Sequence, residues 1–180
     1  AFAPLASFAL FHMVTVFPLS WVYLFTKEAV ARFLVIEVIG GFVGVLAVVA
    51  SGLIADRVGR RYVLGASAAG IAVFSGFAPQ LLDGGEIGEV VFMIVGFGLL
   101  GVAFGQSSGA VAANFATARR YTGAALTSDL AWLVGAGFAP LVALVLASRF
   151  GLVAAGGYLL SGAIGTLVAL GINKELANRN

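Results

Sequence analysis

The residues of this chain best suited to chemistry are a few polar groups that stand alone inside long apolar stretches. Asp129, His12 and Glu37 are ionisable, and Gln106 opens a polar step over the range Gln106–Ser108. A carboxylate near the centre of a bilayer costs roughly 2.5 to 3.5 kcal/mol on insertion scales, so it requires a cavity, a partner or a proton. We therefore treat these groups as candidates for proton exchange and substrate contact.

Each of these groups has two interpretations that the sequence leaves open. Asp129 is either a proton acceptor or substrate contact, or a carboxylate near a helix start that bonds local hydroxyls or Arg120. His12 is either a cavity-lining group able to exchange protons or a hydrogen-bonded packing residue. Glu37 lies near one interface, where it could exchange protons or simply face water. Gln106 either binds a substrate carboxylate or bridges two helices.

The residues of common enzyme sites are missing from the chain. It has one His and no Cys, and it lacks the phosphate-binding pattern G-x-x-x-x-G-K-[ST]. We expect no enzyme, no metal ion and no cofactor. The net charge is only +2, and the basic residues lie between apolar runs rather than on one face, so nucleic acid is not an expected partner.

Composition predicts an integral membrane protein. Of 180 residues, 61% are hydrophobic and 10% are charged, against roughly 45–50% and about 25% in soluble domains. Charges separate six apolar runs, each near the roughly 20 residues that a helix needs to cross a bilayer. The runs are Ala1–Phe25, Phe33–Ala55, Tyr62–Leu82, Val90–Ala113, Tyr121–Ala147 and Leu152–Ile172.

These runs predict an all-α fold of six transmembrane helices in one bundle over residues 1–180. The alternation typical of a transmembrane β-strand is absent, and each run is about twice as long as such a strand. The connections are too short to hold a soluble domain. The first run has no basic segment before it and is too long for a signal peptide, so we expect it to be a span.

The basic residues predict the orientation of the bundle. One side collects most of them and is expected to be cytoplasmic, with both chain ends inside. That side holds Arg57, Arg60, Arg61, Arg119, Arg120, Lys174 and Arg179, and the opposite side holds Lys27, Arg32 and Arg149. The chain begins at Ala1, within an apolar run and without Met, so we expect it to be a piece of a longer protein.

Glycines and other small residues recur every four positions inside the spans. Such stripes let membrane helices approach closely, and some glycines could also act as hinges in a moving protein. The stripes are Gly40 and Gly44; Gly101, Gly105 and Gly109; and Gly157, Ser161 and Gly165. Gly135, Gly137 and Pro140 are further packing or hinge candidates in the fifth run.

The range Gly52–Arg61 reads G-x-x-x-D-R-x-G-R-R between the second and third runs. It predicts a tight charged turn through Gly59, in which Asp56 pairs with an arginine or with the free N–H groups of a neighbouring helix start. This spacing resembles the loop signature of the major facilitator superfamily. That resemblance implies twelve helices in two six-helix halves, with the signature between helices 2 and 3 and often again between helices 8 and 9.

The fourth run, Val90–Ala113, contains no basic residue, whereas the amino-terminal half of that superfamily usually carries an arginine there. The resemblance therefore implies the carboxy-terminal half, helices 7 to 12, built from inverted repeats at about 1–82 and 90–172. The amino-terminal half of the same transporter, membrane lipid, protons and a small-molecule substrate are the implied partners. The implied role of Asp56, Arg57, Gly59, Arg60 and Arg61 is to latch the cytoplasmic ends, with Gly52 allowing close approach to the start of the fifth run.

A narrower resemblance covers most of the chain. The segments Phe8–Ser20, Arg120–Ala125 and Gly135–Pro140 resemble the metabolite:proton symporters, which carry citrate, 2-oxoglutarate, shikimate or proline and betaine. At Ser128-Asp129 those members typically have two neutral residues, so the acid Asp129 departs from their pattern. The substrate or the proton site of this chain could therefore differ from theirs. The implied function is secondary, proton-coupled transport across the inner membrane by alternating access. The alternative is a self-sufficient six-helix channel or scaffold that acts as a homo-oligomer.

Overall fold

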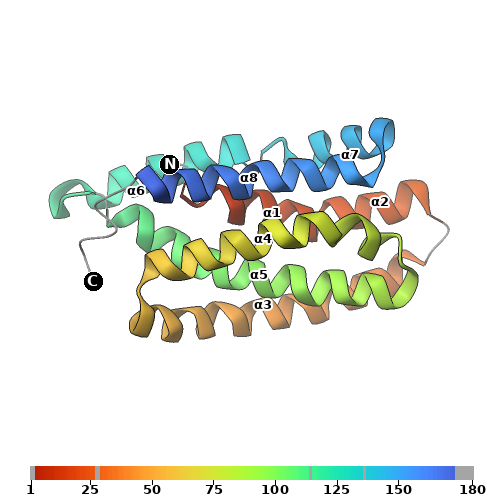
Figure 1. Cartoon of the computed structure of the whole chain (residues 1–180), viewed down its shortest axis with the longest axis horizontal. Coiled ribbons are helices and arrows are strands. Elements are labelled where there is room, and N and C mark those ends of the chain that lie inside the picture. The colour runs from red at the N-terminus through yellow and green to blue at the C-terminus, as the bar shows by residue number, and fades with distance from the viewer. Residues whose placement is uncertain (1–2, 27–28, 114, 136, 173–180) are drawn as a thin grey trace.

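The computed structural model is an elongated bundle of helices that run along one long axis (Figure 1). It describes residues 3–26, 29–113, 115–135 and 137–172, and no strand occurs among them. The helices are α1 (Leu5–Thr15), α2 (Phe17–Phe25), α3 (Val30–Val58), α4 (Arg60–Leu82), α5 (Gly85–Ala112), α6 (Arg120–Gly135), α7 (Ala139–Phe150) and α8 (Leu152–Ile172), with the 3-10 turn η1 at Thr117–Arg119.

Four of the expected spans form single long helices. These are α3, α4, α5 and α8, and the first run adds a fifth candidate span in which α1 and α2 follow one another directly. The boundary between α1 and α2 lies at Val16, just before Pro18. Proline has no N–H to donate and its ring crowds the preceding turn, so a helix bends there.

The structure confirms five of the six expected spans and does not confirm the remaining one, the fifth run, as a single helix. This run divides into α6 and α7, which have 16 and 12 residues, and neither is long enough to count as a span. The break begins after Gly135 and contains Gly137, and Pro140 stands in the first turn of α7. Glycine is a weak helix former and proline cannot continue a helix from the preceding turn, which accounts for the break.

Two connections differ from the expected boundaries. The turn between α3 and α4 is a single residue, Gly59, whose φ of 87° and ψ of 144° suit only glycine. On the other side of the bundle, α5 begins at Gly85, five residues before the apolar run. Glu86 and Glu89 therefore belong to the first turns of α5 rather than to a loop.

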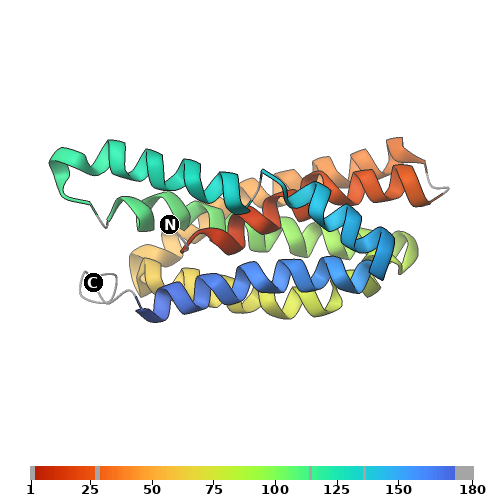
Figure 2. The ribbon, with the colours of Figure 1, turned by 90° about the horizontal axis from the view of Figure 1, so that it is seen from above.

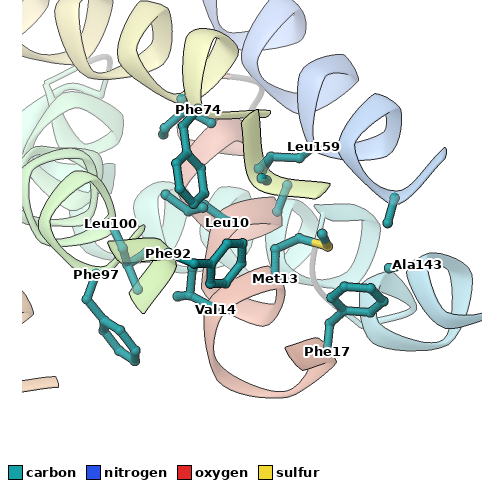
Figure 3. Packing of buried hydrophobic residues seen from close by; sticks show 14 of the residues in the cluster. Leu10, Met13, Val14, Phe17, Phe74, Phe92, Phe97, Leu100, Ala143 and Leu159 are labelled. Carbon is teal, nitrogen blue, oxygen red and sulfur yellow. The ribbon is translucent and has the colours of Figure 1, made fainter. Parts of the chain in front are cut away.

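The core lies where α1 passes between the other helices. Leu10, Met13 and Val14 of α1 pack against Phe74 of α4 and Phe92 of α5, and all five are buried (Figure 3). Phe17 of α2, Ala143 of α7 and Leu159 of α8 close the same cluster. A buried aliphatic or aromatic side chain contributes on the order of 1.5 to 3 kcal/mol in water, and within lipid such packing positions the helices by van der Waals contact.

The outer surface is apolar, as a bilayer requires. Along α3, only 17% of an 18-residue apolar stretch is buried within the bundle. Its large side chains, such as Phe42 and Val49, are exposed on the outer surface. The connections between spans alternate between the two ends of the bundle. The α3–α4 turn and the α5–α6 connection lie at one end, with the C-terminal end of α8, and the α4–α5 and α7–α8 turns lie at the other (Figures 1 and 2).

Candidate functional site

His12 lies in an aromatic cluster between α1 and α6. Its ring meets Trp132 of α6 at 5.8 Å and Phe11 at 5.2 Å, both edge to face, and Phe8 stacks on Trp132 at 4.8 Å. The centroid distances are typical of favourable aromatic pairs. The Nδ1 atom of His12 is buried and has no hydrogen-bond partner among the described residues. Aromatic contacts therefore position the His12 ring, and its Nδ1 atom makes no hydrogen bond to the described residues.

Asp129 is exposed on α6, three residues before Trp132, and so shares a helix face with it. The residues that the structure describes offer it no hydrogen bond or ion pair, including the local hydroxyls and Arg120. Because α1 and α6 are in contact, the structure brings the helices of Asp129 and His12 together. The acid remains available to a ligand or a proton.

Glu37 belongs to a different part of the bundle. It lies on α3, whose main neighbour is α5, and its carboxylate is half-buried with Oε2 lacking a hydrogen-bond partner in the described ranges. The structure therefore leaves Glu37 apart from the aromatic cluster around His12. Its buried oxygen shows that it does not simply face water.

The polar step on α5 mainly bridges helices. The Nε2 atom of Gln106 donates to the Ser51 hydroxyl of α3 at 2.9 Å, and Gln106 is 4% exposed. Ser107 shares a hydrogen bond of 2.9 Å with Ser7 of α1. Ser108 instead borders a pocket of about 580 Å³ between the end of α5 and the start of α6. Of the two interpretations of Gln106, its geometry fits the bridge.

The signature turn is a compact corner at one end of the bundle. The Gly59 N–H donates to the Ala55 carbonyl at 2.9 Å, which closes the last turn of α3 as α4 begins. Asp56 and Arg57 are exposed. A Cβ at Gly52 would meet no atom within 4 Å, so the expected close approach to the fifth run is not made in this conformation.

The glycine stripes on α3 and α5 form a close seam. A Cβ at Gly101 would overlap the Gly44 carbonyl oxygen and the Ala47 side chain, and one at Gly105 would lie 2.5 Å from the Ser51 hydroxyl. Gly40 lies under the Phe97 ring, whose nearest carbon would be 2.6 Å from an added Cβ. These backbones approach closely because the side chains are missing.

The third stripe does not behave as expected. Gly157 faces open space, and Gly165 would make only an ordinary contact with Leu5 at 3.7 Å. The close glycines of α8 are Gly156, which would place a Cβ 2.6 Å from the Ser75 carbonyl of α4, and Gly162, which packs on Ala9 of α1. Small residues recur on both faces of α8, so spacing alone selected the wrong face.

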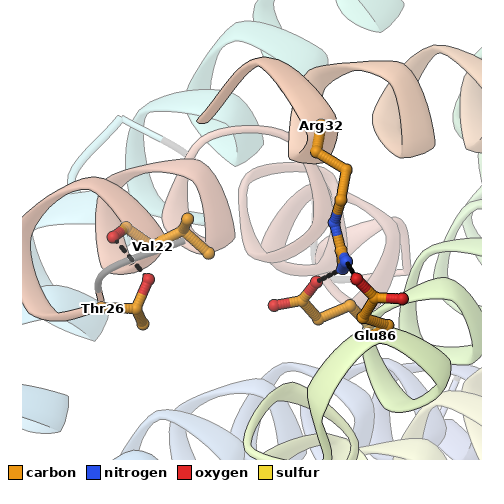
Figure 4. Close-up of polar contacts among 5 residues, drawn as sticks. Val22, Thr26, Arg32 and Glu86 are labelled. Carbon is orange, nitrogen blue, oxygen red and sulfur yellow. Dashed lines mark hydrogen bonds and ion pairs between the residues drawn. The ribbon is translucent and has the colours of Figure 1, made fainter. Parts of the chain in front are cut away.

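An ion-paired cluster at the other end of the bundle was missed by the sequence analysis. Arg32 of α3 bonds the Glu89 carboxylate of α5 at 2.7 Å and also pairs with Glu86 (Figure 4). The side chain of Glu89 is 3% exposed. The signal that could have found it is the three-residue spacing of the two glutamates on the side that also carries Arg32.

The described residues contain no group of three His, Asp or Glu side chains that could hold a metal ion. Long apolar helices with an apolar outer surface, isolated buried polar groups and charged ends define a helical membrane protein that crosses the bilayer several times. No family model matches the chain, and no solved structure matches it.

Curated relatives narrow this class. The chain is 34% identical over 188 aligned positions to the inner membrane metabolite transport protein YhjE of Escherichia coli, across 99% of this chain and 42% of that protein. Two Haemophilus influenzae proteins named metabolite transport proteins are 34% and 33% identical over 74% and 71% of this chain, and 30% of each of them. The chain belongs to the same family as these metabolite transport proteins, and it spans less than half of their length.

Proposed function

We propose that the chain is the carboxy-terminal six-span half of a twelve-helix secondary transporter of the major facilitator superfamily. The complete transporter moves a small metabolite, an organic acid or zwitterion, across the inner membrane by alternating access. The observation that carries this proposal is the relationship to metabolite transport proteins. The longest match covers 99% of this chain and 42% of the relative. An inner membrane location is stated in the name of that relative.

The helix pairings support two three-span repeats of inverted topology. In the first repeat the spans are α1 with α2, α3 and α4; in the second they are α5, α6 with α7, and α8. The second span of one repeat contacts the first span of the other in both directions, as α3 with α5 and as α6 and α7 with α1. The third spans, α4 and α8, pack on each other, and each also packs on the first span of the other repeat. Such exchange symmetry is typical of transporter halves.

The charge distribution supports a cytoplasmic location for the signature turn. The α3–α4 turn and the start of α6 lie at one end of the bundle, and the start of α3 and the end of α7 lie at the other (Figure 1). The helix ends of the first group carry Arg57, Arg60, Arg61, Arg119 and Arg120, and those of the second group carry Arg32 and Arg149. Lys27, Lys174 and Arg179 lie outside the described residues. By the positive-inside rule the first end is cytoplasmic, so the signature turn joins two spans on the inner face.

Asp129 and His12 are the proposed substrate and proton groups. The buried Nδ1 atom of His12 has no hydrogen-bond partner within the described ranges, and Asp129 stands one turn from the tryptophan that contacts His12. A buried polar atom left without a hydrogen bond costs free energy, so such atoms are kept where a ligand or proton completes them. Protonation at this site biases the equilibrium between inward-open and outward-open states and thus couples uptake to the proton gradient.

The test uses the full-length protein in liposomes with an imposed pH gradient and labelled citrate, 2-oxoglutarate, shikimate or proline. Asp129→Asn and His12→Gln are expected to reduce gradient-driven accumulation by at least tenfold while exchange of internal for external substrate continues. Asp83→Asn, which removes an exposed acid in the α4–α5 connection, is the matched control and should transport normally. Intact accumulation in Asp129→Asn would show that this acid is not the coupling group.

A further inference from the structure

Two arginines from distant parts of the chain share one pocket at the end of α5. Arg60 begins α4 directly after the signature turn, and Arg120 begins α6. Both line a pocket of about 260 Å³ with Gly109, Ala112 and Ala113. The fold therefore places two guanidinium groups against the same helix end.

Gly109 makes room for one of these guanidiniums. An added Cβ there would overlap Nη1 of Arg60, so the glycine lets the guanidinium lie against the α5 backbone. The other members of this stripe, Gly101 and Gly105, pack against α3 instead. Gly109 thus accommodates an arginine side chain, whereas Gly101 and Gly105 allow α3 and α5 to pack closely.

Neither guanidinium is neutralised by the protein in the ranges that the structure describes. Arg120 uses Nε to donate to the Phe115 carbonyl at 3.4 Å, and neither Arg60 nor Arg120 forms an ion pair with a described carboxylate. Asp56, on the preceding turn of α3, is exposed. Arg32, at the opposite end, contrasts with them because it is paired with two glutamates. Two like charges in one pocket favour an anion between them.

The adjoining pocket of about 580 Å³ shares Arg120, Gly109 and Ala112 with the first and continues along α6. Hydroxyl-bearing residues line it at Ser108, Thr117, Tyr121 and Ser128, and no acidic residue of the part of the chain that the structure describes borders either pocket. Its remaining walls are mostly small apolar side chains. The combined groove therefore offers guanidiniums at one end, hydroxyl donors beside them and an apolar extension.

We propose that Arg60 and Arg120 bind a phosphate group, supplied by an anionic phospholipid of the membrane. The groove lies where the spans end, which is the depth of lipid headgroups, and basic pockets between helices recognise such headgroups. Guanidinium forks match phosphate oxygens in two-point hydrogen bonds. The hydroxyls contact the glycerol region, and the apolar extension receives the start of an acyl chain. This site does not depend on which metabolite the protein carries.

The test is native mass spectrometry of the full-length protein titrated with phosphatidylglycerol, phosphatidylcholine or inorganic phosphate. Phosphatidylglycerol should bind preferentially. Each of Arg60→Gln and Arg120→Gln should weaken that binding about fivefold, because one basic group near a charged surface contributes about 1 kcal/mol. Arg119→Gln is the matched control, since Arg119 neighbours Arg120 and lines neither pocket.

Gly109→Ala keeps every charge but displaces Arg60, so it should also weaken phosphatidylglycerol binding. Because this variant retains both arginines, weaker binding in it cannot come from misfolding caused by the loss of an arginine. Equal weakening by Arg119→Gln would overturn the proposal, because binding would then follow general charge. Binding of inorganic phosphate as tight as that of the lipid would exclude lipid as the source. Displacement of the lipid by citrate or 2-oxoglutarate would assign the groove to the transport path instead.

Discussion

The α3–α5 seam and the divided fifth run are both apolar and glycine-containing, yet they are held in different ways. The seam combines close backbone approach at Gly101, a buried hydrogen bond from Gln106 and the ion pair of Arg32 with Glu89. The fifth run is interrupted between α6 and α7, and α6 touches α1 and α5 much less extensively than α3 touches α5. The proposed transport function would use both kinds of region, a rigid body and a segment that can shift. The comparison assigns rigidity to the seam.

The substitution expected to destabilise the α3–α5 seam most removes the ion pair between Arg32 and Glu89. Arg32→Ala would remove the guanidinium that pairs with the buried Glu89 carboxylate. Breaking a fully buried pair costs about 3 to 5 kcal/mol, and because the Arg32 side chain is 32% exposed we expect a loss of about 3 kcal/mol. Chemical unfolding of the full-length protein in detergent measures the loss. Glu86→Ala is the control, because this partner is 79% exposed and should matter little. Equal stability of Arg32→Ala and Glu86→Ala would show that the ion pair does not clamp the seam.

Closing the backbone approach should have the next largest effect. Gly101→Ala adds a Cβ that meets the Gly44 carbonyl and Ala47, and backbone atoms cannot rotate away. Overpacking of this kind costs about 1 to 3 kcal/mol, measured by the same unfolding experiment. Gly41→Ala on α3 faces open space and should be neutral. The seam would not depend on close approach if the two alanine variants were equally stable.

The buried amide should contribute less. Gln106→Ala removes the hydrogen bond to Ser51, and a typical bond of this kind contributes about 1 kcal/mol. Gln80→Ala removes an exposed amide from α4 and serves as the matched control. The difference between the two variants in unfolding free energy isolates the bridge. No difference would mean that Ser51 and Gln106 meet without stabilising the seam.

The break in the fifth run should be the least sensitive region. Gly137 is exposed and its φ is not positive. An added Cβ would sit 3.0 Å from the Leu133 carbonyl oxygen, a contact that a small shift relieves because Gly137 lies at a break between two helices, unlike the closer overlap at Gly101. We expect a change within about 0.5 kcal/mol, as for surface substitutions. A loss as large as that of Gly101→Ala would make the break a tightly packed element and remove the contrast with the seam.

Hydrophobic length alone predicted most of the helices, because a chain in lipid must satisfy its backbone groups within helices. The break was harder to predict. Gly135, Gly137 and Pro140 suggested packing or a hinge, but whether weak helix formers interrupt a span depends on the contacts of its neighbours. The start of α5 depended on a partner that is remote in sequence, since Glu86 and Glu89 enter the helix where Arg32 meets them.

The candidate site was predictable only in part. His12 and Asp129 stood out because ionisable groups are rare in apolar runs, and their helices do meet. The aromatic cluster around His12 could not be predicted, because Phe8 and Trp132 look like ordinary span residues until the helices are packed. The same limit applied to α8, where Gly156 and Gly162, rather than Gly157 and Gly165, face neighbouring helices.

Counterflow tests the central claim most directly. Liposomes containing the full-length protein are loaded with unlabelled citrate, 2-oxoglutarate, shikimate or proline and diluted into a trace of the labelled compound, without any pH gradient. An alternating-access carrier predicts that one of these labelled compounds rises inside to a transient peak above its final equilibrium level. Steady equilibration without a peak, which is the behaviour of an open channel, would contradict the account.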